Sequence, residues 1–193
     1  MSTPNSAPGA PPENHRYSAV TQSFHWISAL LVLAAFAMGP GGPEDIVYIP
    51  ERATERAIHE TLGMAVFAIT VLRILWKLLD RAPTPVPLER WMHIASKAAQ
   101  GMLYLLLLAV PLTAIFGAWL EGHPVVLLGG LTFAAPIATA HELGNTIAEI
   151  HGWLGDVIIW IAGLHAAAAI YHHWFLKDAV LASMLPSWWP LKK

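Results

Sequence analysis

Hydrophobic positions gather in four long runs along this chain, and polar or helix-breaking segments separate them. The runs extend over about residues 23–39, 59–79, 101–120 and 150–175. Each is close to the roughly 20 apolar residues that a helix needs to cross a hydrocarbon core about 30 Å thick. Only helices and closed barrels satisfy their backbone hydrogen bonds in lipid. The pattern therefore predicts an all-α integral membrane protein built as a four-helix bundle.

The connections between the runs carry the signals that end a helix. Residues 39–43 (GPGGP) end the first run, and three prolines between residues 83 and 87 end the second. Pro111 lies inside the third run, where neighbouring helices can satisfy the freed carbonyl. We interpret residues 88–98 as an interfacial lead-in to the third helix and residues 121–149 as a long loop.

The length and the terminal segments indicate a single membrane domain. A chain of 193 residues suffices for one domain. Residues 1–15 are rich in Pro, Ser and Ala without an apolar period, so we predict a disordered cytoplasmic tail there. The four-helix transmembrane domain is expected over residues 16–186, followed by a short cytoplasmic tail over residues 187–193.

Composition narrows the possible chemistry. Hydrophobic residues make up 55% of the chain and charged residues 12%, whereas soluble domains carry about 25% charged residues. The chain has no cysteine and ten histidines. Disulfides, iron–sulfur clusters and thiolate ligation of haem are therefore excluded, and histidine is the candidate metal ligand.

Basic residues predict the orientation, because they favour the cytoplasmic side of a membrane. With four spans, nine of the 11 lysines and arginines fall on one side and only Arg52 and Arg56 on the other. We therefore expect both termini in the cytoplasm and a multi-pass membrane protein. The nine are Arg16, Arg73, Lys77, Arg81, Arg90, Lys97, Lys177, Lys192 and Lys193.

Four histidines pair by depth across the predicted bundle. His59 and His151 each open a run from the outer face. His165 lies fourteen residues after His151, about 21 Å deeper and within about 40° of the same helix face. His25 opens the first run from the inner face. Depth therefore pairs His59 with His151 and His25 with His165, the arrangement needed to hold two haem irons stacked across a membrane.

Two alternatives stay open for these histidines. Zinc is the rival ligand, although a two-histidine site without further donors is a poor zinc site. A non-haem helical membrane protein, such as a metal transporter, would use the same polar groups differently. If haem is bound, histidine on both sides of the iron leaves no open position for oxygen, which favours outer-sphere electron transfer.

Two further polar residues are candidates for the inner site. Arg73 repeats the fourteen-residue spacing from His59 and is a candidate partner for a haem propionate, or else for lipid headgroups. His172 lies two turns beyond His165, beside Tyr171, His173 and Trp174. We interpret His172 as a catalytic residue that hydrogen-bonds and protonates a quinone, or else as part of an interfacial aromatic belt.

Five segments, in this order, resemble the bacterial cytochrome b561 family. They are Phe24-His25-Trp26; His59-Glu60-Thr61-Leu62-Gly63; His151-Gly152-Trp153-Leu154-Gly155; Gly163-Leu164-His165; and His172-His173-Trp174-Phe175-Leu176-Lys177-Asp178. The resemblance covers about residues 16–186. It implies a four-helix membrane bundle with two b haems, held by His25 with His165 and by His59 with His151, and a quinone-side histidine at His172.

The resemblance also implies an activity. It is that of a superoxide oxidase, an oxidoreductase that takes electrons from superoxide on the periplasmic side and reduces ubiquinone. The outer side carries many more acidic than basic residues, which disfavours the approach of an anion and leaves a periplasmic protein donor open. The alternative is a membrane-anchor cytochrome b subunit that relays electrons for a larger dehydrogenase or hydrogenase-type complex.

Overall fold

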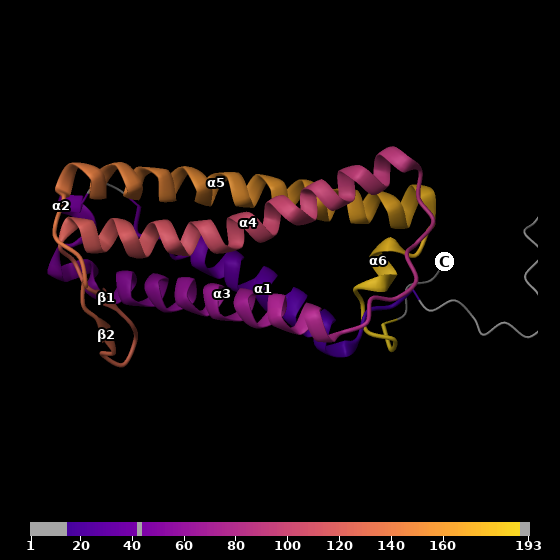
Figure 1. The fold of residues 1–193 in the computed structure, drawn as a ribbon, viewed down its shortest axis with the longest axis horizontal. Helices are drawn as coiled ribbons and strands as arrows, with labels where there is room; N and C mark the ends of the chain where they lie inside the picture. The colour runs from indigo at the N-terminus through magenta and orange to yellow at the C-terminus, as the bar shows by residue number, and fades with distance from the viewer. Residues whose placement is uncertain (1–14, 42–43, 190–193) are drawn as a thin grey trace, which may run out of the picture.

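Four long helices lie side by side in the computed structural model, which describes residues 15–41 and 44–189 (Figure 1). They are α1 (Ala19–Ala37), α3 (Ala53–Leu79), α4 (Arg90–Glu121) and α5 (His141–Tyr171). The shorter elements are α2 (Glu44–Val47), the 3-10 turn Pro50–Arg52, strands β1 (Val125–Val126) and β2 (Thr132–Phe133), the π-helical turn His172–Leu176, and α6 (Val180–Ser183).

The bundle has two distinct ends. The hairpin end carries α2, the antiparallel pair β1–β2 and the first residues of α3 and α5 (Figure 1). The terminal end carries residues 15–18, the connection between α3 and α4, and residues 172–189. Successive long helices run in alternating directions between these two ends, so the expected four-helix bundle is confirmed. Within the described residues, the β1–β2 pair is the one element that is not helical.

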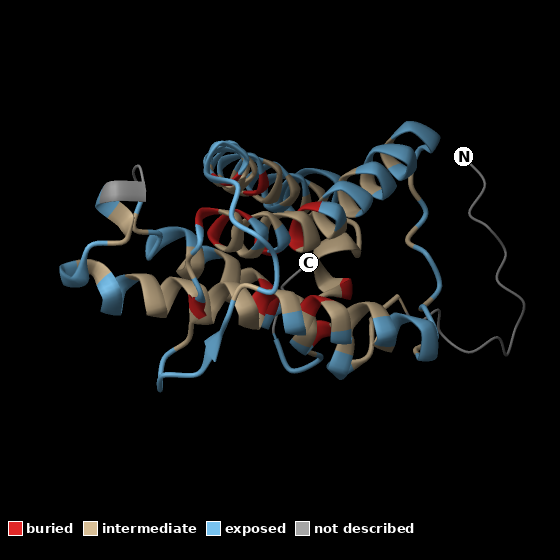
Figure 2. Cartoon of the chain, turned by 60° about the vertical axis from the view of Figure 1, so that its left-hand side comes forward, coloured by how far each residue is buried: buried red, intermediate tan, exposed pale blue. Residues whose placement is uncertain are grey.

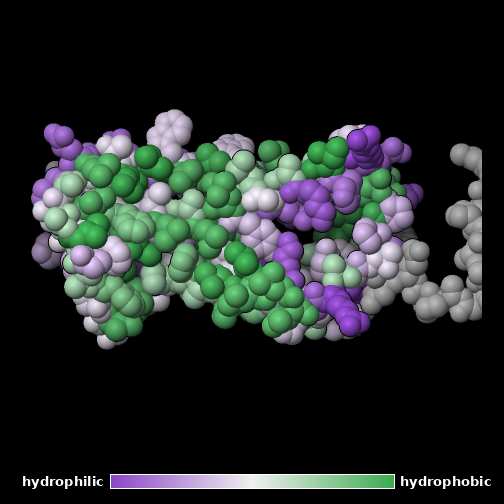
Figure 3. All heavy atoms as spheres, in the orientation of Figure 1, coloured by the Kyte–Doolittle hydropathy of each residue, from purple (hydrophilic) through white to green (hydrophobic). Residues whose placement is uncertain are grey.

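All four long helices are apolar and long enough to cross a membrane. The spans are Ala19–Ala37, Pro50–Leu79, Arg90–Glu121 and His141–Leu176. Many large apolar side chains point outward, among them Trp153, Trp160 and Leu164, each more than two-thirds exposed. Figure 3 shows hydrophobic side chains covering most of the visible face, with hydrophilic ones gathered toward the terminal end. Such a surface on helices of this length is typical of a protein surrounded by lipid.

Small residues bring α4 and α5 into close contact at the hairpin end. A Cβ added to Gly144 of α5 would lie 2.8 Å from the backbone nitrogen of Glu121, and one added to Gly117 of α4 would lie 3.3 Å from the nitrogen of Ala148. Farther along, a small core joins α3, α4 and α5 through Val66, Leu106, Leu107 and Ile158. Figure 2 shows that few residues are buried and that these lie where helices face one another. Close approach of small residues is the usual way in which helices associate in lipid.

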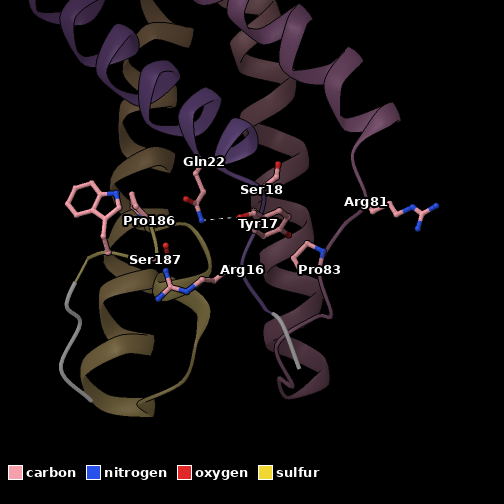
Figure 4. Close-up of a pocket in the computed structure, with 10 residues that line it drawn as sticks. Arg16, Tyr17, Ser18, Gln22, Arg81, Pro83, Pro186 and Ser187 are labelled. Atoms are coloured by element: carbon pink, nitrogen blue, oxygen red, sulfur yellow. Dashed lines mark hydrogen bonds between the residues drawn. The ribbon is translucent and has the colours of Figure 1, made fainter. Parts of the chain in front are cut away.

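Hydrogen bonds join the first and last described segments at the terminal end. Gln22 of α1 donates from Nε2 to the main-chain oxygens of Tyr17, Ser183 and Leu185. Trp26 donates to the oxygen of Met184. These segments line a cavity of about 490 Å³ (Figure 4). The bonds fix the start of α1, and with it the position of His25.

Several helix boundaries differ from those expected. Residues 90–98 are not a separate interfacial segment but the first turns of α4. The loop expected over residues 121–149 is shorter, because α5 begins at His141. Residues 1–14 of the predicted tail and residues 190–193 lie outside the described residues. His15, at the end of that predicted tail, has its Nδ1 2.8 Å from the oxygen of Thr84.

Candidate functional site

The structure brings His59 of α3 and His151 of α5 together near the hairpin end. Their ring centroids lie 6.0 Å apart and their planes are inclined by 79°. Both residues sit on long helices from different parts of the chain, and α1 and α4 pack beside them. This pairing was predicted from the depths of the two histidines in the sequence.

Main-chain oxygens fix the orientation of both rings. The Nδ1 of His59 lies 2.8 Å from the oxygen of Ala35, and the Nδ1 of His151 lies 2.9 Å from the oxygen of Val110. A carbonyl oxygen only accepts, so each Nδ1 carries the proton and each Nε2 keeps its lone pair. Nε2 is then free to bind a metal, which is the common arrangement of metal-binding histidines.

The free oxygen of Ala35 follows from the way in which α1 ends. The last four carbonyls of a helix have no partner within it. Here the chain turns at Gly39, whose N–H donates to Phe36 and so leaves Ala35 free to accept from His59. The glycine- and proline-rich break after α1 therefore contributes directly to the site.

A cavity of about 750 Å³ adjoins this histidine pair. Gly63, Gly152 and Gly155 line it, and a Cβ added to any of them would meet no atom within 4 Å. Ligand and cofactor cavities commonly measure about 300–1,000 Å³. The glycines leave open the space that side chains would otherwise fill.

Charged residues at the hairpin end line the same cavity. Arg56 forms an ion pair with Glu60 at 3.5 Å, and its guanidinium lies 4.8 Å from the ring centroid of Tyr48. Glu60 also accepts from the N–H of Val126, which attaches β1 to α3. The other acidic lining residues are Glu121, Glu149 and Asp156. The electrostatic environment next to the histidines is therefore mainly acidic.

The second predicted pair lies toward the terminal end. His25 of α1 and His165 of α5 have ring centroids 6.3 Å apart, with planes inclined by 66°. Fourteen residues of α5 separate His151 from His165, so the two pairs are about 21 Å apart along the bundle. Each pair thus takes one histidine from α5.

Arg73 contacts the second pair directly. Its Nη2 lies 3.3 Å from the Nδ1 of His25. A guanidinium only donates, so in this contact Nδ1 is the acceptor and the ring proton resides on Nε2. That is the opposite tautomer to those of His59 and His151. For Nε2 of His25 to bind a metal, the guanidinium must turn to another acceptor.

His172 lies apart from both pairs, in the π-helical turn that follows α5. Its Nδ1 lies 2.5 Å from Oδ2 of Asp178, and Oδ1 of Asp178 accepts from the N–H of Val180 at the start of α6. Trp174, two residues after His172, is 72% exposed. Asp178 was not predicted as the partner of His172, because the chain reverses at Lys177 with a positive φ of 53° that no local signal indicates.

The remaining histidines are outside the two pairs. His93 and His141 are exposed on α4 and α5. His123 stacks on Tyr48 with ring centroids 3.5 Å apart.

Comparison with known proteins agrees with this architecture. The family model described as prokaryotic cytochrome b561 matches residues 16–187. The chain belongs to the prokaryotic cytochrome b561 family. It is therefore a bacterial membrane cytochrome that transfers electrons, and proteins of this family bind b-type haem.

Three relatives show how far the similarity extends. Cytochrome b561 homolog 2 of Escherichia coli is 28% identical over 88% of this chain and 91% of its own length. Probable superoxide oxidase CybB of Yersinia pestis is 31% identical over 89% and 96%. Cytochrome b562 of Cereibacter sphaeroides is 26% identical over 88% and 94%. The similarity thus spans nearly the whole membrane domain.

The paired histidines of this cytochrome b561 protein fit the binding of haem iron. A metal–imidazole bond is about 2.0–2.1 Å long and the nitrogen lies about 1.1 Å from the ring centroid, so two imidazoles that bind one metal from opposite sides have centroids about 6.2–6.4 Å apart. The observed separations are 6.0 and 6.3 Å. The open space beside Gly63, Gly152 and Gly155 supports the same conclusion for the pair at the hairpin end.

Proposed function

We propose that this chain binds two b haems, one between His59 and His151 and one between His25 and His165, and passes electrons from superoxide to ubiquinone. The observation that carries the proposal is that two pairs of histidine rings, toward opposite ends of one bundle, have centroids 6.0 and 6.3 Å apart. The hairpin end then faces the periplasm and both termini face the cytoplasm of a bacterial inner membrane, as the basic residues predict.

A b haem held by two histidines supplies one-electron transfer without an open position for oxygen. The role of the protein is to hold the four imidazoles, keep water away and set the separation between the two sites. Each superoxide gives up one electron and becomes O₂. Ubiquinone takes up two electrons and two protons to become ubiquinol, so two superoxide ions are consumed for each quinone.

Arg56 supports superoxide as the donor at the hairpin end. It lines the cavity that adjoins His59 and His151, and contacts with Glu60 and Tyr48 fix its position. A fixed positive charge beside an opening raises the local concentration of a small anion. The probable superoxide oxidase CybB, at 31% identity, points to the same donor.

His172 is the proposed catalytic residue at the terminal end. With Nδ1 held by Asp178, its Nε2 is the nitrogen that hydrogen-bonds a quinone oxygen and delivers a proton to it. A carboxylate behind a histidine fixes the tautomer and stabilises the protonated ring. Proton uptake then occurs from the cytoplasm, on the side where the quinone is reduced.

The test is an anaerobic spectrum of the detergent-purified protein, reduced with dithionite and compared with the oxidised form, followed by a superoxide pulse with and without ubiquinone. We expect b-type bands that superoxide reduces and ubiquinone reoxidises. An absence of such bands would contradict the haem assignment. If the b-type bands are present but superoxide leaves them unchanged, the chain is a two-haem electron relay with a different donor.

A second candidate function is that of a membrane-anchor cytochrome b subunit, relaying electrons from a partner enzyme. The four acidic residues around the cavity at the hairpin end favour it, because they repel superoxide and attract a basic protein. Under this function the purified chain alone is inert to superoxide. Electron transfer appears only when a basic redox protein is added, and it weakens as salt is raised.

A further inference from the structure

Two basic side chains of α3 lie over one aromatic ring of α4. The guanidinium carbon of Arg73 and the Nζ of Lys77 are each 5.2 Å from the ring centroid of Tyr104. Arg73 and Lys77 are four residues apart and therefore share one face of α3. A cation within about 6 Å of an aromatic face is attracted by the ring, so Tyr104 holds the two charges together.

Arg73 has donors that the protein does not use. Its Nε is buried and makes no hydrogen bond with any of the described residues. Its Nη2 contacts the Nδ1 of His25, the nitrogen that must carry the proton if Nε2 is to bind iron. An acceptor from outside the chain would satisfy Nε and release His25 at the same time.

We propose that Arg73 and Lys77, positioned by Tyr104, form a two-cation site for the two propionates of the haem between His25 and His165. This inference rests on the proposed two-haem function. A haem carries two propionates on one edge, and one arginine fork matches one carboxylate. Lys77 is one helical turn closer to the terminal end than Arg73 and is exposed there, where the second propionate would reach the membrane surface.

The two cations also give electron flow a direction. Positive charge beside a haem stabilises its reduced form and raises its reduction potential, whereas the carboxylates of Glu60 and Glu121 line the cavity at the hairpin end and act in the opposite sense. The charge distribution therefore drives electrons from the hairpin end to the terminal end. Tyr104 is a positioning residue in this arrangement, because it acts through the two basic side chains.

The test is a redox titration of both haems in the full-length protein, in the wild type and in Lys77→Gln. We expect the potential of one haem to fall and that of the other to stay constant. A tenfold loss in the equilibrium constant for reduction corresponds to 59 mV for one electron. Lys77→Arg keeps the charge, so its potentials should stay close to those of the wild type. Tyr104→Leu should lower the potential of the same haem as Lys77→Gln does.

Arg81→Gln is the matched control. It removes a positive charge from the same end of the bundle, four residues farther on, and Figure 4 shows the Arg81 side chain directed away from the other residues drawn. We expect both potentials to be unchanged in Arg81→Gln. A shift equal to that of Lys77→Gln would show a general surface-charge effect and overturn the specific site.

Assignment of the shifted haem uses His59→Ala, which is expected to keep only the haem at the terminal end. Lys77→Gln should shift the single remaining potential in that background. If two haems are present and neither potential responds to Lys77→Gln, the propionate site is wrong while the proposed function stands. If His25→Ala leaves the wild-type spectrum unchanged, the two-haem function itself fails, and the propionate site fails with it.

Discussion

The Nδ1 of His151 lies 2.9 Å from the main-chain oxygen of Val110. The two residues belong to α5 and α4, the helices that approach most closely at Gly144 and Gly117. Helix packing therefore sets the ring orientation, because the acceptor is part of the α4 backbone. A change in the contact between these two helices should be detectable at the imidazole.

The first prediction concerns the four paired histidines. His59→Ala or His151→Ala should remove one b-type haem and leave the other, because an imidazole on each side is needed to hold the iron. His25→Ala or His165→Ala should remove the other haem. The measurement is the ratio of haem to protein, with the absorption and spin-resonance spectrum of the haem that remains.

His141→Ala is the control for these variants, because His141 is an exposed histidine on the same helix as His151. It should keep both haems. Retention of two haems with unchanged spectra in any of the four paired variants would show that the pairing is wrong.

The second prediction concerns His172 and its partner Asp178. His172→Gln should leave both haems in place and slow the reduction of ubiquinone by about 10²-fold or more, because a positioned proton donor is lost. Asp178→Asn should have a smaller effect and change the pH profile of the rate, since the amide cannot stabilise a protonated imidazole. The measurement is quinone reduction from pH 5 to 9, starting from the chemically reduced protein.

Asp178→Glu separates a positioning role from a structural one. It keeps the carboxylate and should recover most of the wild-type pH profile. If the wild type and Asp178→Asn reduce quinone at equal rates and with equal pH profiles, the contact between His172 and Asp178 is purely structural.

The third prediction concerns Asp80, which directly follows α3 at the terminal end. Hydrogen bonds from Thr21 and Ser18 hold the pKa of its carboxyl below the usual 3.8. Because the folded-state pKa is lowered, this contact stabilises the fold fully above pH 3.8, and its contribution is lost as the pH falls through the lowered pKa. The thermal unfolding temperature of the wild type should therefore fall below that pH more steeply than that of Asp80→Asn.

The fourth prediction concerns the contact between α4 and α5. Gly144→Ala places a Cβ 2.8 Å from the backbone nitrogen of Glu121, where neither backbone can move independently of its helix. We expect a loss of about 1–3 kcal/mol in the free energy of unfolding and weaker haem retention at the hairpin end. Gly101→Ala in α4 is the matched control, because its Cβ would meet nothing within 4 Å. It should be neutral or slightly stabilising.

The four spans could be predicted from the sequence because lipid requires long apolar helices, and hydropathy records this directly. The ends of the helices could not. Residues 90–98 and 141–149 are polar enough to be taken for an interfacial segment and a loop, yet they continue α4 and α5 beyond the apolar part. Hydropathy detects the environment of a helix, whereas its ends depend on caps and on contacts with neighbouring segments.

The histidine pairs could be predicted because the fourteen-residue spacing of His151 and His165 is a property of one helix. The groups that orient the rings could not. The partner oxygens of Ala35 and Val110 belong to the main chain, which looks the same at every residue, so no residue type indicates them. The link between Lys77 and Tyr104 depends on how α3 and α4 are rotated against each other, which periodicity alone leaves undetermined.

The contribution of α5 to both histidine pairs has a consequence for biosynthesis. His25 and His59 emerge from the ribosome long before their partners, and α5 is the last long helix of the described chain to be made. A nascent chain with only three helices inserted has two imidazoles without their partners on α5. It cannot bind a haem iron from both sides. Under the proposed two-haem function, cofactor loading is a late event that follows membrane insertion at both sites, and a chain truncated before His151 should be recovered colourless.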